Sequence, residues 1–232
     1  MSNRKINLFI SGPIRPSCDD VIKVISNLKK QFPNSVIFFS TWKSNPENTK
    51  IKEFVNYFIE TEEPTDEFIY NNITNKTKQQ LSQPDLYKWT LSFYKMFYGL
   101  KKIFDFIIEN KIQIGEGELC LRIRSDIIIE FDNGYINMII QNMTNQYFVD
   151  NRRNSGVSFD DCFCITDFSN MKKVWYYENI IKLNDDIKQS WNIEDLVKRN
   201  VTKENIDILY VDKNFLKNFF VLRNNNLTES LL

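Results

Sequence analysis

The chain contains no histidine, and this absence excludes several kinds of active site. Ser-His-Asp and Cys-His nucleophiles, His-based metal sites and imidazole proton shuttles all depend on that side chain. The chain also lacks an excess of charge of either sign, because 30 Lys and Arg residues balance 30 Asp and Glu residues. Proteins that bind nucleic acids usually carry a basic excess that neutralises phosphates. We therefore expect no nucleic-acid partner.

Long apolar runs are also lacking. A membrane-spanning helix needs about 18 consecutive apolar residues, and a signal peptide needs roughly 7–15, more than the run near the N-terminus provides. We therefore predict no transmembrane segment and a cytoplasmic protein, in which cysteines stay reduced. Cys162 and Cys164 would lie on one face of a predicted strand, but no second pair or histidine completes a metal site. We interpret these cysteines, with Cys18 and Cys120, as small buried hydrophobic residues.

The 232 residues are 42% hydrophobic and 26% charged, which is ordinary for a globular protein. Residues 5–10 and 35–40 are predicted strands, and Ser17 or Asp19 can cap a helix between them that ends near Gln31. The second strand is apolar on both faces, as in a buried parallel sheet. We predict an α/β fold over residues 1–232, a Rossmann-like single domain with a mostly parallel sheet flanked by helices.

Further elements follow the same periodicities. Residues 64–83 are polar and predict a long loop, and 84–110 predict the longest helix. Asp167 or Ser169 can cap a later helix. The remaining strand candidates are residues 54–59, 119–126, 127–131, 159–165, 206–211 and 219–222.

The predicted strand at 119–126 carries unusual charges. Its alternation places Arg122 and Arg124 on one face, with Asp126 in phase at the end of the strand. Charged side chains on a buried strand are costly unless they are paired. The pattern therefore indicates either a binding site or structural ion pairs with Glu118 or Glu130.

In open α/β sheets, ligands bind beyond the carboxyl ends of the strands. The residues at these predicted ends combine a small backbone, guanidinium groups, an aromatic ring and carboxylates, namely 11–15, 41–42, 126 and 167, with 160–161 nearby. Arginine matches phosphate oxygens, tryptophan offers a stacking surface, and a carboxylate can hold Mg²⁺ or Mn²⁺. The combination suits a nucleotide diphosphate, although Gly12 stands alone and no phosphate-loop or dinucleotide motif is present.

Four segments carry a resemblance to a known family: Ser11-Gly12-Pro13-Ile14-Arg15, Phe39-Ser40-Thr41-Trp42, Leu121-Arg122-Ile123-Arg124-Ser125-Asp126 and, more loosely, Asp160-Asp161-Cys162-Phe163. In order and spacing, over about residues 5–170, the chain resembles the WavE-type and related small glycosyltransferases of the GT-A fold. This resemblance implies transfer of a sugar from a nucleotide-sugar donor, with UDP favoured, to a glycan, lipid-glycan or protein acceptor.

The resemblance also implies roles for individual residues. Arg15 would contact the nucleotide or its phosphates, and Thr41 and Trp42 would line the base pocket. Asp126 would match the last acid of the family's Asp-x-Asp motif and bind Mn²⁺ or Mg²⁺. Arg124 stands at the first acidic position, which leaves metal dependence open. The other donor-binding residues that we assign are Ser11, Gly12, Pro13, Arg122, Arg124 and Ser125.

The available side chains limit the mechanism. Without histidine, an inverting transfer would use a carboxylate as general base, and Asp161 is our first candidate and Asp160 the second. A retaining transfer would need neither. Two other functions remain open: a non-catalytic nucleotide- or partner-binding protein on the same fold, and a nucleotidyltransferase, which would need several converging carboxylates.

Overall fold

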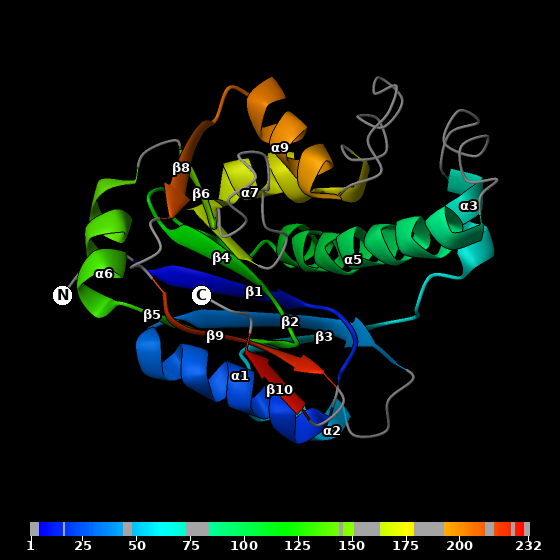
Figure 1. Ribbon diagram of the computed structural model, residues 1–232, viewed down its shortest axis with the longest axis horizontal. Helices are drawn as coiled ribbons and strands as arrows, with labels where there is room; N and C mark the ends of the chain where they lie inside the picture. The colour runs from blue at the N-terminus through cyan, green and yellow to red at the C-terminus, as the bar shows by residue number, and fades with distance from the viewer. Residues whose placement is uncertain are drawn as a thin grey trace.

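The computed structural model describes residues 5–15, 17–43, 48–72, 84–143, 146–150, 163–178, 193–211, 216–223 and 226–229. Within them, a seven-stranded sheet has the order β3-β2-β1-β4-β7-β6-β8, and a three-stranded sheet has the order β10-β9-β5 (Figure 1). The strands of the large sheet are β1 (Ile6–Ser11), β2 (Val36–Trp42), β3 (Tyr57–Thr61), β4 (Leu119–Arg124), β6 (Gln146–Asp150), β7 (Phe163–Asp167) and β8 (Asp207–Val211). Those of the small sheet are β5 (Ile127–Phe131), β9 (Leu216–Arg223) and β10 (Asn226–Glu229).

Helices cover both faces of the large sheet. Figure 1 shows α5 with α7 and α9 on one side of it, and α1 with the small sheet on the other. The described helices are α1 (Cys18–Gln31), α2 (Asn48–Lys52), α3 (Asp66–Asn72), α5 (Pro84–Glu109), α6 (Asn133–Asn142), α7 (Phe168–Trp175) and α9 (Ile193–Lys203). None of these helices is both long enough and apolar enough to cross a membrane.

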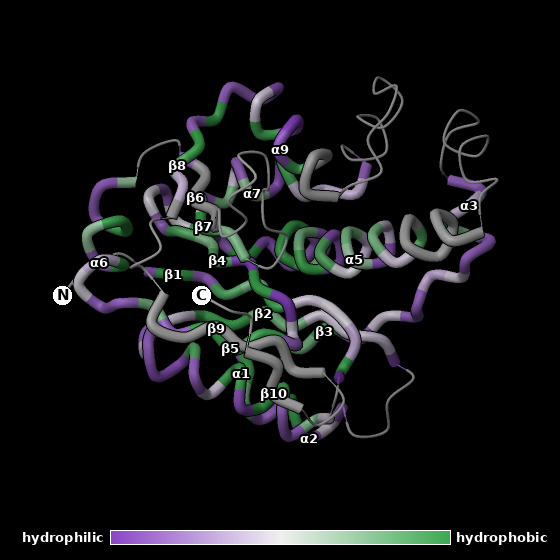
Figure 2. Tube along the Cα trace, in the orientation of Figure 1, coloured by the Kyte–Doolittle hydropathy of each residue, from purple (hydrophilic) through white to green (hydrophobic). Residues whose placement is uncertain are grey.

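Alternation along the central strands produces two cores. Leu8 and Ile10 of β1 face the α1 side, whereas Phe9 faces the α5 side and contacts Phe38 edge to face, with ring centroids 5.4 Å apart. Figure 2 shows that hydrophobic residues are frequent along these strands and along α5. Because both faces are covered, the strands are apolar on both sides, as the sequence predicts for β2.

The first helix confirms its predicted start. The side chain of Ser17 accepts a hydrogen bond from the backbone N–H of Asp20, and the helix buries Val21, Ile25 and Leu28. The predicted helix at 84–110 is also confirmed, as α5, and so is the strand at 127–131, as β5. The predicted loop at 64–83 is wrong in part, because residues 66–72 form α3.

Strand direction divides the sheet into two parts. β3, β2, β1 and β4 are mutually parallel, whereas β7 runs antiparallel to β4, with Leu119 opposite Asp167 and Ile123 opposite Phe163. The mostly parallel α/β domain is thus confirmed, with an antiparallel insertion beside β4. That insertion decides which residues reach the candidate site.

Candidate functional site

The connections around β1 create a switch point in the sheet. β2 and β3 lie on one side of β1, and β4 lies on the other. The chain therefore diverges between the carboxyl ends of β1 and β4, which is where open α/β sheets bind ligands. Ser11 is paired with Arg124 in this register, so the segments that follow both residues emerge side by side.

The loop after β1 is held against the turn after β4. Gly12 has a φ of +137°, and its N–H donates to the carbonyl oxygen of Ser40 at 3.1 Å. A Cβ at this glycine would lie 3.1 Å from Oγ of Ser125, and that hydroxyl donates to the carbonyl oxygen of Pro13 at 2.9 Å. Only glycine tolerates this φ and this close approach without strain. The loop therefore delivers Arg15 to the turn that carries Asp126.

Three residues form a charged cluster at this point, which we call the arginine–aspartate cluster: Arg15, Arg124 and Asp126. Nε of Arg124 donates to Oδ1 of Asp126 at 3.0 Å, and Nη2 donates to Oδ2 at 2.8 Å. Nη2 of Arg15 lies 3.3 Å from the same Oδ2. The side chains of Arg15, Arg124 and Asp126 are 57%, 22% and 5% exposed. The guanidinium groups thus lie between the carboxylate and solvent.

The cluster keeps Asp126 ionised. Burial by itself would raise the pKa of this carboxyl, but the hydrogen bonds from Arg124 and the charges of Arg124 and Arg15 outweigh burial. The pKa of Asp126 is therefore lowered from its ordinary value. The carboxylate acts as an acceptor that fixes the planar fork of Arg124 in one orientation.

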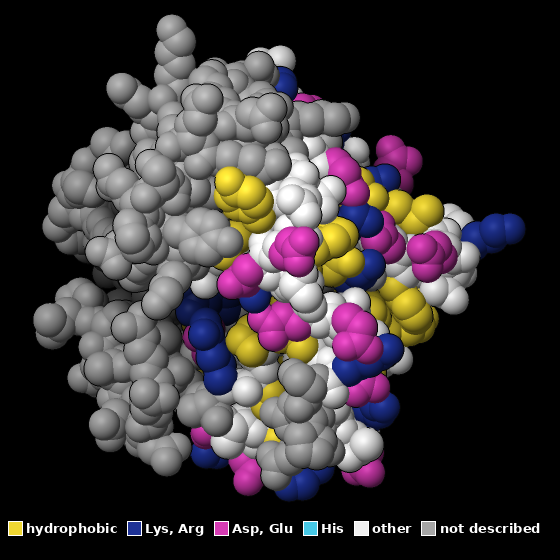
Figure 3. Space-filling model, turned by 90° about the vertical axis from the view of Figure 1, so that its right-hand side faces the viewer, with side chains coloured by type: hydrophobic (Ala, Val, Ile, Leu, Met, Phe, Trp, Pro, Cys, Tyr) yellow, Lys and Arg dark blue, Asp and Glu magenta, His cyan; other side chains and the backbone are white. Residues whose placement is uncertain are grey.

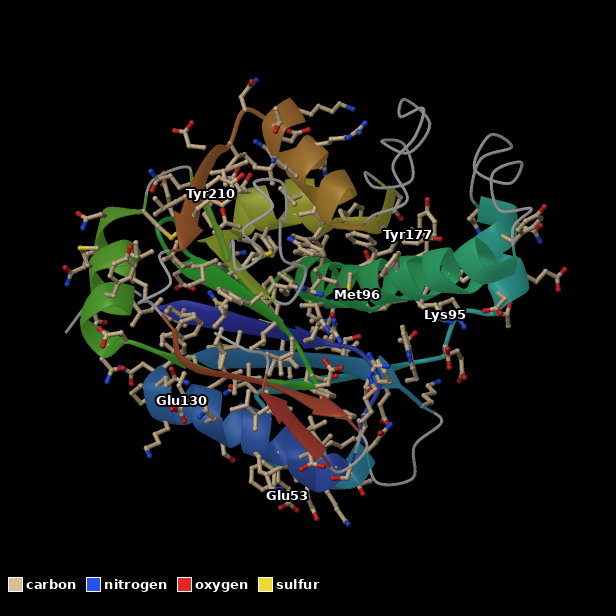
Figure 4. All side chains as sticks on the ribbon, viewed as in Figure 1. Glu53, Lys95, Met96, Glu130, Tyr177 and Tyr210 are labelled. Carbon is tan, nitrogen blue, oxygen red and sulfur yellow. The ribbon has the colours of Figure 1, made fainter. Side chains whose placement is uncertain are left out.

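Arg122 lies two residues earlier on the same face of β4, and its side chain is fully buried. Its guanidinium carbon lies 4.3 Å from the centroid of the Trp175 ring, and Nη2 contacts the thioether of Met96 at 2.9 Å. Figure 4 shows Met96 on the side of α5 that faces the sheet. Among the described residues, Nε and Nη1 of Arg122 have no hydrogen-bond partner, and no acidic side chain pairs with this guanidinium.

Glu118 and Glu130, the acids that could have formed structural ion pairs with the arginines of β4, contact other residues. Glu118 accepts hydrogen bonds from Lys5 at 3.4 Å and from Nδ2 of Asn7 at 2.8 Å, and Oε1 of Glu130 accepts one from Asn27 at 3.3 Å. The acceptor that is shown for Arg124 is Asp126. Arg124 therefore pairs at the carboxyl end of β4.

Two buried serines line the same side of the sheet. Ser11 and Ser40 are opposite each other in the pairing of β1 with β2, and neither hydroxyl has a hydrogen-bond partner in the part of the chain that the structure describes. Thr41 is buried beside them, and Trp42 is 7% exposed. A Cβ at Gly99 of α5 would lie 3.4 Å from the Trp42 ring, so the ring packs under that helix. The role of Thr41 and Trp42 as a base pocket stays a prediction.

The structure corrects the position of Asp167. From the sequence, Asp167 was expected at the ligand-binding edge, but β7 runs antiparallel to β4, so Asp167 lies beside Leu119 at the opposite edge. Its side chain caps α7 by accepting from the N–H of Asn170 at 2.9 Å, which confirms the predicted cap. The candidate bases Asp160 and Asp161 fall outside the described residues and stay predictions.

The described residues do not fit a divalent cation. Mg²⁺ and Mn²⁺ prefer about six oxygen ligands, and several carboxylates usually supply them. Asp126 is the one carboxylate of the cluster, and guanidinium groups occupy both of its oxygens. Within the described part of the chain, no group of three or more Cys, Asp or Glu residues could hold a metal. We therefore derive no step through a metal ion.

The cysteines with described positions behave as hydrophobic residues. Cys18, Cys120 and Cys164 are buried and not in disulfides, and Sγ of Cys164 lies 3.8 Å from Sδ of Met171. Burial raises the pKa of the Cys120 thiol well above its ordinary value, which makes this thiol unreactive. Cys162 lies outside the described residues.

Elsewhere on the surface, charges are paired more evenly. Figure 3, which faces the right-hand side of Figure 1, shows acidic and basic side chains intermixed over its described part. Lys95, for example, lies 3.0 Å from Glu63 and 2.8 Å from Asp66. Such exposed pairs contribute little to stability.

Known proteins match this chain by fold alone. No protein-family model and no curated protein sequence matches it. Its structure is similar to the nucleoside-diphosphate-sugar pyrophosphorylase of Vibrio cholerae RC9, with a TM-score of 0.53, 6% identity and coverage of 94% of this chain and 95% of that chain. It is also similar to an active-site mutant of LgtC, with a TM-score of 0.51, 7% identity and coverage of 89% and 72%.

The glycosyltransferase GlyE of Streptococcus pneumoniae TIGR4 gives a TM-score of 0.49 at 14% identity, covering 89% of this chain. This chain spans only 45% of GlyE. The likeness to LgtC confirms the predicted GT-A glycosyltransferase fold. The narrower WavE-type resemblance stays a prediction.

Several contact residues were not found from the sequence. Met96, Gly99 and Trp175 lie on helices far along the chain, and their helical periodicity indicates only core packing. Ser40 belongs to a motif that we compared with the family, but its pairing with Ser11 depends on strand register. The contact between Ser40 and Ser11 could have been predicted only if the register of the parallel β1–β2 pair had been known.

Proposed function

We propose that this chain is a glycosyltransferase that moves a sugar from a nucleotide-sugar donor, with a UDP-sugar favoured, to a glycan, lipid-glycan or protein acceptor. The observation that carries the proposal is the arginine–aspartate cluster at the switch point of a GT-A fold. Guanidinium groups bind phosphate oxygens in bidentate fashion, and a nucleotide sugar presents two adjacent phosphates.

The structural neighbours support this choice of ligand class. LgtC is a galactosyltransferase, and one structure holds it in complex with donor and acceptor sugar analogues. The Vibrio cholerae protein is a nucleoside-diphosphate-sugar pyrophosphorylase. At 6–7% identity these proteins share the fold with this chain. The choice of a nucleotide sugar therefore depends on the cluster together with the fold.

The cluster suggests how the transfer would be assisted. When the bond between the sugar and the diphosphate breaks, negative charge develops on the leaving phosphate oxygen. Arg15 and Arg124 would stabilise that charge, and fixed cationic groups act strongly there because they need no reorganisation. Asp126 would hold the guanidinium of Arg124 in the orientation that binds the phosphate. For an inverting transfer, Asp161 stays our first candidate base and Asp160 our second.

A nucleotidyltransferase is the second candidate, because the pyrophosphorylase shares this fold over 94% of the chain. That chemistry would need several converging carboxylates for its metal ions. In the cluster, one carboxylate faces two guanidinium groups, and the described residues contain no group of three or more Cys, Asp or Glu residues that could hold a metal. The observations therefore favour the glycosyltransferase.

The test is a donor panel. Purified protein is incubated with UDP-, GDP- and dTDP-sugars, with and without Mn²⁺ or Mg²⁺, and release of the nucleoside diphosphate is measured with and without glycan acceptors. We expect release from one donor class, and its loss in Arg124→Gln. Nucleotide binding without release would support a non-catalytic protein on the same fold. Release of pyrophosphate from a nucleoside triphosphate and a sugar phosphate would support a nucleotidyltransferase instead.

A further inference from the structure

We infer that Arg15 and Arg124 take the place of a divalent cation and hold the donor diphosphate directly, with Asp126 as the residue that positions them. This inference rests on the proposed function, because it concerns the donor of that reaction. It goes further by assigning the charge that neutralises the diphosphate to the protein itself. Four observations carry it.

The first observation is the charge of the arginine–aspartate cluster. Two guanidinium groups and one carboxylate give these three residues a net charge of plus one. A metal site has the opposite sign, since carboxylates gather there to attract the cation. A cation arriving at Asp126 would meet two positive charges within the same cluster. A diphosphate arriving there would be attracted.

The second observation is the order of exposure. Arg15 and Arg124 are 57% and 22% exposed, whereas Asp126 is only 5% exposed. A ligand that approaches from solvent therefore reaches the guanidinium groups before it reaches the carboxylate. A metal that bound Asp126 would compete with the guanidinium groups for the two carboxylate oxygens. A phosphate could bind the arginines without breaking the contacts between Asp126 and Arg124.

The third observation is the rigidity of the arrangement. Arg124 is held by two nearly parallel hydrogen bonds to Asp126, at 3.0 and 2.8 Å. The Arg15 loop is tied to the same turn through Ser125 and Pro13. Arginines that are already oriented lose less side-chain entropy when they bind an anion. Asp126 thus has a use in anion binding that does not involve a metal.

The fourth observation is Arg122, whose fully buried guanidinium has two donor atoms without a partner among the described residues. The side-chain contacts shown for it are with neutral groups, the Met96 thioether and the Trp175 ring. A buried charge without a paired anion is costly, and its field is weakly screened. Since Arg122 lies two residues before Arg124 on the same strand face, its field adds to the attraction for a diphosphate.

The experiment is calorimetric titration of the full chain with UDP, GDP and inorganic pyrophosphate, first in EDTA and then in Mn²⁺. We expect one nucleoside diphosphate to bind in EDTA, with a Kd that changes less than about threefold when Mn²⁺ replaces EDTA. Pyrophosphate should bind in EDTA at the same site and compete with it. Binding that appears only with Mn²⁺ would overturn the inference and leave the proposed function standing.

Variants separate the arginines from the carboxylate. Arg15→Gln removes an exposed charge while Asp126 keeps Arg124, so the fold should survive. Arg15→Gln and Arg124→Gln should each weaken nucleotide binding in EDTA by about tenfold or more, the value of one charge-assisted contact. Arg124→Lys, which keeps the charge but loses the fork, should fall between wild type and Arg124→Gln. Arg199→Gln, an exposed change on α9, is the matched control and should bind as wild type does.

Asp126→Asn tests its positioning role. The arginine account predicts weaker binding in EDTA and the same ratio of Kd values in Mn²⁺ and EDTA as wild type. A metal site predicts loss of Mn²⁺-dependent binding alone. If neither the nucleotides nor pyrophosphate bind under any condition, the inference and the proposed function both fail. If nucleotides bind in EDTA but no donor is cleaved, the inference stands and the transferase proposal fails.

Discussion

At the amino end of β4, Glu118 pairs with Lys5 at 3.4 Å and with the amide of Asn7 at 2.8 Å. At the carboxyl end, Arg124 and Arg15 share Asp126. Both ends belong to the same strand of the same sheet. One end pairs a single base with a single acid, whereas the other gathers two bases around one acid.

On our proposal, this difference separates charges that stabilise the fold from charges that bind a ligand. Asp167 reaches the amino edge and is satisfied by the backbone of α7. Near the carboxyl edge, Ser11, Ser40 and Arg122 have buried polar atoms without a hydrogen-bond partner among the described residues. Buried polar groups are normally satisfied in native proteins, and exceptions call for an explanation. In the described residues, Ser35, Asn48, Tyr177 and Glu178 also carry such atoms, so the three at this edge support a ligand there only together with the arginine–aspartate cluster.

The largest expected effect is a loss of stability on substitution of a glycine with positive φ. Two such glycines, one near each end of β4, can be compared. Gly12→Ala places a side chain at φ +137° and 3.1 Å from Ser125 Oγ. We expect the free energy of unfolding to fall by about 2 kcal/mol in urea titrations, and nucleotide binding to fall as well. Gly117→Ala, at φ +87°, should cost about 1 kcal/mol and leave binding unchanged. Normal nucleotide binding by Gly12→Ala would contradict the claim that the carboxyl end of β4 differs from the amino end in binding the ligand.

The next effect has the opposite sign. Arg122→Met replaces the buried guanidinium by an apolar chain, and without ligand we expect the free energy of unfolding to rise by about 1 kcal/mol. Nucleotide affinity should fall, because the buried charge is lost. Arg199→Met, on the exposed side of α9, should change stability by less than about 0.5 kcal/mol. A less stable Arg122→Met would mean that Arg122 serves the fold through Trp175.

A pH profile sharpens the assignment of Asp126. Its pKa is lowered in the folded protein, so its ionised form adds stability above the ordinary pKa of 3.8. That contribution is lost as pH falls through the lowered folded value. Asp126→Asn should be less stable than wild type near pH 7, and the gap should narrow in acid. Equal gaps at pH 7 and pH 3, measured by denaturant titration, would argue against the ion pairs.

The smallest expected effect belongs to the amino end of β4. Lys5→Gln breaks a partly exposed pair with Glu118 and should cost no more than about 0.5 kcal/mol. Nucleotide binding should not change. Arg15→Gln also removes one exposed charge and should cost as little stability, but it should weaken binding. Similar binding by the two variants, in parallel titrations, would remove the distinction between the two ends.

The sequence predicted much of this site because its residues follow parallel strands. Ser11 and Arg124 end neighbouring strands, so Arg15 and Asp126 were expected together, and the structure brings them together. Hydrophobic alternation carries no information on strand direction, which is why Asp167 was assigned to the wrong edge.

Contacts made by helices were harder to foresee. The exposure of Trp42 depends on Gly99 of α5, and periodicity does not show which turn of a helix crosses which strand. Arg122 contacts residues of two different helices, so its burial could not be predicted from the sequence either. We did not predict α3 within the polar stretch at 64–83, because the helix is short and Ile69 is its one buried residue.

The most direct test compares thermal midpoints of the wild-type protein in EDTA with millimolar UDP, GDP, UMP and GMP. A ligand that binds only the folded state raises the midpoint by mass action. The account predicts a rise with one nucleoside diphosphate in EDTA and a much smaller rise with the matching monophosphate. A rise that requires Mn²⁺, or that is equal for mono- and diphosphates, would contradict it.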